Sequence, residues 1–174
     1  KSFDSLLEAT LKGVHKEWLT NQKFVTEYTI ALESIYNTAI SAQQYSQKFC
    51  PNPENILRVL RYIRPEDVRV IMVAQDPYPN LRDATGIAFH SEAQKCPQSA
   101  RKINENLIYW KHLDPKYVNN SNYMKYVEQG VLLINRSLTT REGSPGEHVS
   151  NWGQTTELLL STIPANTVSV LLGR

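Results

Sequence analysis

A short apolar segment followed by a proline-braced turn constrains the fold of this chain most strongly. Five of the six residues from Val68 to Val73 are apolar, and most of them are β-branched. Such a run is typical of a strand buried on both faces, as in a parallel sheet covered by helices. The turn after it, Gln75-Asp76-Pro77-Tyr78-Pro79, is restricted by two prolines. Because open α/β sheets bind ligands at the carboxyl ends of their strands, Asp76 and Tyr78 are candidates for a binding site.

The remainder of the chain alternates between helical and strand patterns. Apolar residues at spacings of three and four predict helices over Ser5–Leu19, Phe24–Ala39, Glu54–Ile63, Ala100–Trp110, Asn122–Gln129 and Gln154–Thr162. Two further apolar runs predict strands over Val131–Ile134 and Thr167–Leu172. We therefore predict an α/β fold in one domain over residues 1–174, with a small, mostly parallel central sheet flanked by helices on both faces in three layers.

Composition excludes several classes of protein. Hydrophobic residues make up 41% of the 174 positions and charged residues 21%, as in ordinary globular domains. We find no apolar run long enough to span a bilayer and no signal-peptide pattern at Lys1, which predicts an intracellular protein. The cysteines Cys50 and Cys96 form no disulfide framework, and the four histidines lack metal-ligand spacing. We expect no metal, no cofactor and no membrane association.

Charge alone does not indicate a nucleic-acid-binding protein, because the net charge is only +2. Several cations nevertheless lie in or near the loops expected at the strand ends. They are Arg82, Arg101, Lys102, Arg136 and Arg141. A scattered basic surface explains any one of them equally well.

Two segments resemble the motifs of one enzyme family. Residues 74–78, Ala-Gln-Asp-Pro-Tyr, followed by Gly-Ile-Ala-Phe at 86–89, resemble the water-activating motif of uracil-DNA glycosylases. That family has Gly-Gln-Asp-Pro-Tyr and then a loop ending in Gly-Leu-Ala-Phe, so Ala74 is a departure. The segment from Gln129 to Arg141 is the second close match, and His148 falls near the family's Ser-His. Pro97 and Ser99 resemble a Pro-Ser pair that precedes a helix in the family.

The resemblance implies a DNA base-excision repair enzyme. Such an enzyme flips uracil out of DNA, hydrolyses the N-glycosidic bond and leaves an abasic site. The implied catalytic residue is Asp76, which orients water and stabilises positive charge on the sugar. The implied uracil-binding residues are Gln75 through its backbone, Tyr78 as a wall against the methyl group of thymine, Phe89 as a stacking surface and Asn135 as the group that recognises the base edge. The implied DNA-binding residues are Ser99, Arg136 and His148.

Four of these residues also have an ordinary structural explanation. Asp76 suits a turn opener, Asn135 a strand-end turn, Phe89 a core position and Ser99 a helix N-cap. Their occurrence together in the family's order favours the enzyme. The alternatives are a DNA-binding or replication-accessory module on the same fold, with a replication protein as partner, and a small-molecule nucleosidase.

The family has a third signature, a His-Pro-Ser segment and a loop with an intercalating leucine, after its last core strand. The present chain stops at Leu171-Leu172-Gly173-Arg174, before that point. We therefore expect a C-terminally incomplete domain with reduced activity. The expected partner is uracil-containing DNA, single- or double-stranded, bound by a monomer in the nucleus or wherever the genome is replicated.

Overall fold

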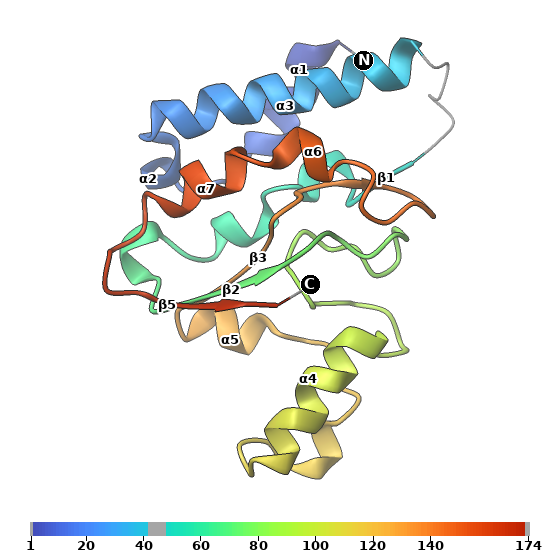
Figure 1. The fold of residues 1–174 in the computed structure, drawn as a ribbon, viewed down its shortest axis with the longest axis vertical. Coiled ribbons are helices and arrows are strands. Elements are labelled where there is room, and N and C mark those ends of the chain that lie inside the picture. The colour runs from blue at the N-terminus through green and yellow to red at the C-terminus, as the bar shows by residue number, and fades with distance from the viewer. Residues whose placement is uncertain (1, 42–47, 173–174) are drawn as a thin grey trace.

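The computed structural model describes residues 2–41 and 48–172, which fold around a small parallel sheet (Figure 1). The α-helices are α1 (Phe3–Leu11), α2 (Lys16–Leu19), α3 (Gln22–Ser41), α4 (Gln98–Tyr109), α5 (Met124–Glu128), α6 (Val149–Trp152) and α7 (Thr155–Leu160). The strands are β1 (Phe49–Cys50), β2 (Val70–Ala74), β3 (Val131–Asn135), β4 (Thr140–Arg141) and β5 (Val168–Leu171). Four 3-10 helices complete the described part: η2 (Pro53–Asn55), η3 (Arg58–Arg61), η4 (Pro65–Asp67) and η5 (Pro115–Tyr117).

The central sheet has the order β3-β2-β5, and both of its pairings are parallel. Helices α1, α2, α3, α6 and α7 lie on one side of it, and α4 and α5 lie on the other (Figure 1). The strands β1 and β4 form a separate antiparallel ribbon of two residues each. This arrangement confirms the predicted three-layer α/β fold.

The core forms where the predicted apolar stripes meet. Helix α3 buries Phe24, Tyr28 and Leu32, which recur every four residues, against α6 and α7. The Tyr28 ring packs against that of Trp152, with centroids 5.4 Å apart. Trp18 is fully buried, and its indole N–H donates to the Ile63 carbonyl over 2.8 Å. Pairing of this donor removes the cost of burying a polar atom.

Two helix predictions were wrong in extent. The segment predicted as one helix over Ser5–Leu19 is divided into α1 and α2, because Gly13 between them has φ of +79°. That left-handed conformation is favourable for glycine and ends a helix. The segment Glu54–Ile63 forms η2 and η3 instead of an α-helix. Its apolar residues are nearly consecutive, so they do not form one helical stripe. Two short turns, separated at Leu57 with φ of −108°, bury these residues instead.

Strand β5 lies at an edge of the sheet and is exposed along its length. Val168 is 60% exposed and Leu171 is 77% exposed. Its residues lie parallel to those of β2, from Val168 beside Val70 to Leu171 beside Val73. Among the helices of the described residues, none is both long enough and apolar enough to span a membrane.

Candidate active site

The site begins where β2 and β3 end side by side. Ala74, the last residue of β2, pairs with Asn135, the last residue of β3. Pairing continues beyond the strands, because the N–H of Arg136 donates to the Ala74 carbonyl and that of Ser137 donates to the Gln75 carbonyl, each over 2.8 Å. These bonds hold the Gln75–Pro79 turn against the segment that follows β3, so two distant motifs share one edge of the sheet.

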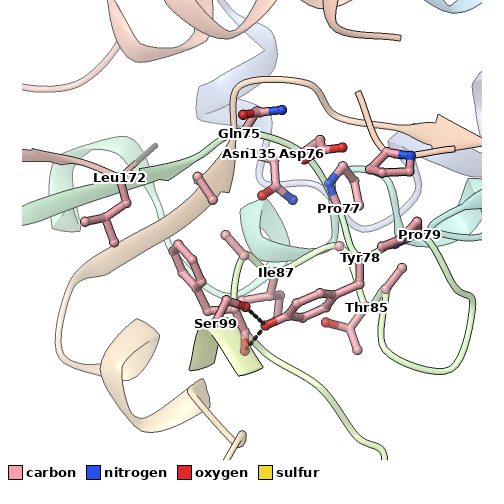
Figure 2. Close-up of a pocket in the computed structure, with 16 residues that line it drawn as sticks. Gln75, Asp76, Pro77, Tyr78, Pro79, Thr85, Ile87, Ser99, Asn135 and Leu172 are labelled. Carbon is pink, nitrogen blue, oxygen red and sulfur yellow. Dashed lines mark hydrogen bonds between the residues drawn. The ribbon is translucent and has the colours of Figure 1, made fainter. Parts of the chain in front are cut away.

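A pocket of about 370 Å³ lies at this edge. Figure 2 shows that Asn135 and Tyr78 point into it from different segments. The lining residues named by the sequence motifs are Gln75, Asp76, Tyr78, Phe89, Ser99 and Asn135. The others are mainly apolar, among them Ile87, Pro145 and Leu172. A small pocket with apolar walls and a few convergent polar groups suits a planar base.

The Asp76 carboxylate is held by a distant loop. Its Oδ2 accepts a hydrogen bond of 2.6 Å from the backbone N–H of Gly146, between β4 and α6. Burial raises the pKa of Asp76 above its usual value, and the Gly146 N–H opposes this shift. The Gly143 N–H also donates to the Pro79 carbonyl over 2.8 Å, so the same loop fixes the turn at two points. Asp76 is therefore oriented, partly desolvated and available to accept a proton or stabilise a cation.

Tyr78 is anchored through its phenol oxygen. The hydroxyl lies 2.8 Å from Ser99 Oγ and also donates to the Phe89 carbonyl over 3.4 Å (Figure 2). Burial raises the pKa of Tyr78 to about 12, so the phenol is neutral at physiological pH. These partners restrict the ring, which gives the pocket a rigid wall.

Phe89 follows a sharply turned loop. It has φ of +64°, a conformation that side chains other than glycine rarely adopt. Gly86, three residues earlier, has φ of +79°, and a Cβ atom there would lie 1.7 Å from the Asn55 carbonyl oxygen. The loop is also tied to β3, because the Ala88 N–H donates to the Leu133 carbonyl over 3.2 Å. Strained residues of this kind persist where surrounding contacts over-determine the backbone, which is common at binding sites.

The side-chain amide of Asn135 faces the pocket. The residue is 8% exposed, and its backbone carbonyl accepts from Thr156 Oγ1 at 3.5 Å. Its side-chain amide makes no hydrogen bond to any of the residues described, and the same holds for the Gln75 backbone N–H. Since buried polar groups are nearly always paired, these donors and the acceptor are ready for a ligand.

The three residues predicted to bind DNA lie in different environments. Ser99 is exposed at the pocket rim, and α4 starts one residue before it, so the alternative that Ser99 caps this helix is wrong. Arg136 is exposed directly after β3. His148 lies outside the pocket and is only 6% exposed; its Nδ1 is 2.9 Å from Thr139 Oγ1 and its ring packs on Phe49. Contact of these residues with DNA stays a prediction.

Sequence reasoning missed the donor to Asp76. Gly146 is 70 positions away and acts through its backbone, so no side-chain pattern indicates it. It also missed Thr85, Pro145 and Leu172 as lining residues. In the described part of the chain, no group of three or more His, Cys, Asp or Glu side chains could hold a metal ion.

The fold and the site together define a three-layer α/β protein with a base-sized pocket at its strand ends. Comparison with known proteins identifies the family. A uracil-DNA glycosylase of Tropheryma whipplei is 31% identical over 168 residues, which cover 92% of this chain and 70% of that protein. A uracil-DNA glycosylase of Mycoplasma genitalium is 38% identical over 108 residues, 59% of this chain and 42% of that protein. The chain belongs to the uracil-DNA glycosylase family.

Solved structures agree with this assignment at the level of the fold. The crystal structure of mimivirus uracil-DNA glycosylase superposes with a TM-score of 0.72 at 24% identity, over 91% of this chain and 57% of that one. A glycosylase structure from Nitratifractor salsuginis gives a TM-score of 0.62 at 19% identity. No protein-family model matches the chain. The chain thus spans about half the length of the Mycoplasma genitalium and mimivirus proteins.

Proposed function

We propose that this chain binds a uracil extruded from DNA and hydrolyses the bond between the base and its deoxyribose. The observation that carries the proposal is the convergence of Asp76, Tyr78, Phe89 and Asn135 on one pocket of about 370 Å³. A protein that only bound DNA would have no need of all four groups in one pocket. Since DNA is the substrate, we propose that the protein acts where the genome is replicated.

Each lining group has a task in this reaction. The Asn135 amide supplies one donor and one acceptor, which match the O4 carbonyl and the N3–H of uracil. The Gln75 N–H, which bonds to no described residue, is a donor for a second base carbonyl, and Phe89 offers a ring for stacking. Tyr78, fixed through Ser99, occupies space that the thymine methyl group would need.

Hydrolysis then requires charge separation at the sugar. As the bond to the base lengthens, the base takes the electron pair and the sugar becomes positive. The Asp76 carboxylate stabilises that positive charge and accepts a proton from the attacking water. Groups that donate to the base carbonyls, such as the Gln75 N–H, stabilise the negative charge that develops on the base. The products are free uracil, which is reprotonated, and an abasic sugar.

Base release from a single-stranded oligonucleotide with one uracil tests the proposal. We expect release by this chain and a loss of about 10²–10⁴-fold in Asp76→Asn, the range typical of a general base. Asp67→Asn is the matched control, because Asp67 is an exposed carboxylate at the opposite end of β2. Equal rates in the two variants would refute the role of Asp76. Release from free deoxyuridine would indicate a nucleosidase instead.

A further inference from the structure

Helix α4 carries a stripe of exposed side chains that begins at the pocket. Ser99, Lys102, Asn106 and Tyr109 follow spacings of three and four residues, so they lie on one face of the helix. All four are exposed, whereas the opposite face includes the buried residue Asn104. Figure 1 shows α4 leaving the carboxyl end of the sheet and running to the far end of the molecule.

The stripe ends in a cluster of exposed aromatic rings. Tyr109 is 76% exposed and Trp110 is 66% exposed; Tyr117, in the η5 turn that contacts α4, is 43% exposed. The rings of Tyr109 and Trp110 meet edge to face, with centroids 5.1 Å apart. Exposed aromatic rings beside cations are the groups on which proteins stack the bases of single-stranded nucleic acids.

The charge along the stripe is positive. Lys102 and Lys111 have no carboxylate within ion-pair distance in the part of the chain that the structure describes. Two carboxylates in this region form ion pairs with other cations. Glu105 Oε1 lies 2.9 Å from Arg101 Nε, and Asp114 Oδ2 lies 3.4 Å from Lys116 Nζ. The surface therefore complements a chain of phosphates.

Helix α4 ends with a lysine at a position where glycine is usual. Lys111 has φ of +60°, its N–H donates to the Ile108 carbonyl over 2.9 Å, and the next N–H, of His112, donates to Leu107 over 2.8 Å. This bonding pattern ends many helices, and its left-handed residue is commonly glycine. A lysine there places a positive charge directly after Trp110, at some cost in backbone strain.

The length of the helix fits a short stretch of DNA. Its 12 residues rise by about 1.5 Å each, so α4 is about 18 Å long. One strand of a duplex advances about 3.4 Å per nucleotide, so about five nucleotides cover that distance, and fewer suffice for an extended strand. A strand with its uracil in the pocket can therefore reach Trp110.

We propose that Ser99, Lys102, Asn106, Tyr109 and Trp110, here named the α4 track, bind the unpaired strand that flanks the extruded base. Phosphates lie along Lys102, and a base stacks on Trp110. The proposal rests on the proposed function and deepens it, because it extends the contact with the substrate from the pocket along α4.

Tryptophan fluorescence tests the track directly. Trp18 and Trp152 are fully buried, so a ligand that stacks at the surface acts on Trp110 alone. Titration with uracil-free oligothymidylate should quench this fluorescence, and Trp110→Leu should abolish the change. In anisotropy titrations with labelled oligothymidylate, Trp110→Ala and Tyr109→Ala should each weaken binding by about 5-fold or more, whereas Trp110→Phe should restore most of it. Ile30→Ala, which removes a 55% exposed side chain from α3 on the other side of the sheet, should leave affinity unchanged.

Salt dependence and substrate length give independent readouts. Lys102→Gln should reduce the slope of log affinity against log salt by about 0.7, the value for one phosphate on a single strand, and Lys23→Gln on α3 should not. Flanks of about eight nucleotides should give a lower KM than flanks of about two, with equal kcat, and Trp110→Ala should remove this difference.

Several results would overturn the track. They are unchanged fluorescence at saturating oligothymidylate, equal affinity of Trp110→Ala and Ile30→Ala, or a fluorescence change that follows protein concentration instead of DNA, which would indicate self-association. Failure of the proposed function looks different. Quenching without uracil release from any substrate would refute the enzyme and keep the track, whereas release independent of flank length and without quenching would refute the track alone.

Discussion

Asn135→Asp should convert the base preference from uracil toward cytosine. The Asn135 amide donates through its NH₂ group and accepts through its carbonyl, which matches the O4 and N3–H of uracil. Cytosine presents the inverse pattern, an NH₂ donor and an N3 acceptor. A protonated carboxyl matches that inverse pattern, because its O–H donates to N3 and its carbonyl accepts from the NH₂ group.

The magnitude follows from the environment of the side chain. Asn135 is 8% exposed and its amide has no partner among the described residues, so a mismatched base leaves buried groups unpaired. Each such group costs about 1–3 kcal/mol. Two mismatches therefore disfavour cytosine by about 2–6 kcal/mol in the original protein, roughly 30-fold to 10⁴-fold. The substitution should reduce uracil release by a factor in this range and should raise cytosine release.

The pH dependence gives this prediction a second signature. Burial favours the protonated form of the new carboxyl, so cytosine release should fall as the pH rises through its pKa. Asp76 must be ionised, and burial also raises its pKa, so release should fall again as the pH drops through that value. Cytosine release by the variant should thus have a bell-shaped pH profile, whereas uracil release by the original chain should show only the acidic limb.

The assay is single-turnover release of free base from two single-stranded oligonucleotides that differ only in uracil or cytosine, between about pH 5 and pH 8. The thermal unfolding midpoint serves as the folding control. At the acidic end of this range, where the new carboxyl is protonated, it should change little because the Asn135 side chain bonds to no described residue. Unchanged uracil release, or no cytosine release at any pH from a folded variant, would refute the assignment of Asn135.

The remaining predictions concern three other positions. Tyr78→Ala should release thymine from a thymine-containing oligonucleotide while retaining uracil release; a variant that still rejects thymine would show that Tyr78 is not the wall. Gly86→Ala should lower the free energy of unfolding in urea by more than Gly143→Ala. Both glycines have left-handed φ, which costs alanine about 1–2 kcal/mol at either position. Only at Gly86 would the added Cβ atom also meet a carbonyl oxygen, at 1.7 Å. Asp76→Asn should not lower the unfolding midpoint at neutral pH. Its raised folded pKa means that ionisation costs stability as the pH rises above the unfolded value; a marked decrease would contradict this.

Part of the pocket could be predicted because Asp76, Tyr78 and Asn135 lie at or just after the ends of two apolar strands. Parallel strands end at the same edge, so motifs after β2 and β3 had to meet, and Ala74 does pair with Asn135. The Asp76–Gly146 bond could not be predicted, because a backbone donor 70 positions away leaves no trace in side-chain identity. The burial of His148 could not be predicted either. Its partner Thr139 and the Phe49 ring come from segments that are brought together by pairing of β1 with β4.

Under the proposed function, two opposing influences on Asp76 explain how the site favours bond cleavage. Partial burial withdraws water from the carboxylate, which makes its charge costly, and the Gly146 N–H compensates only in part. In the proposed reaction, a positive charge that develops on the sugar supplies the missing compensation, and it does so only as the bond breaks. The interaction is therefore stronger in the transition state than in the ground state, which is the condition for accelerating the chemical step. Full solvation of Asp76 would remove that difference.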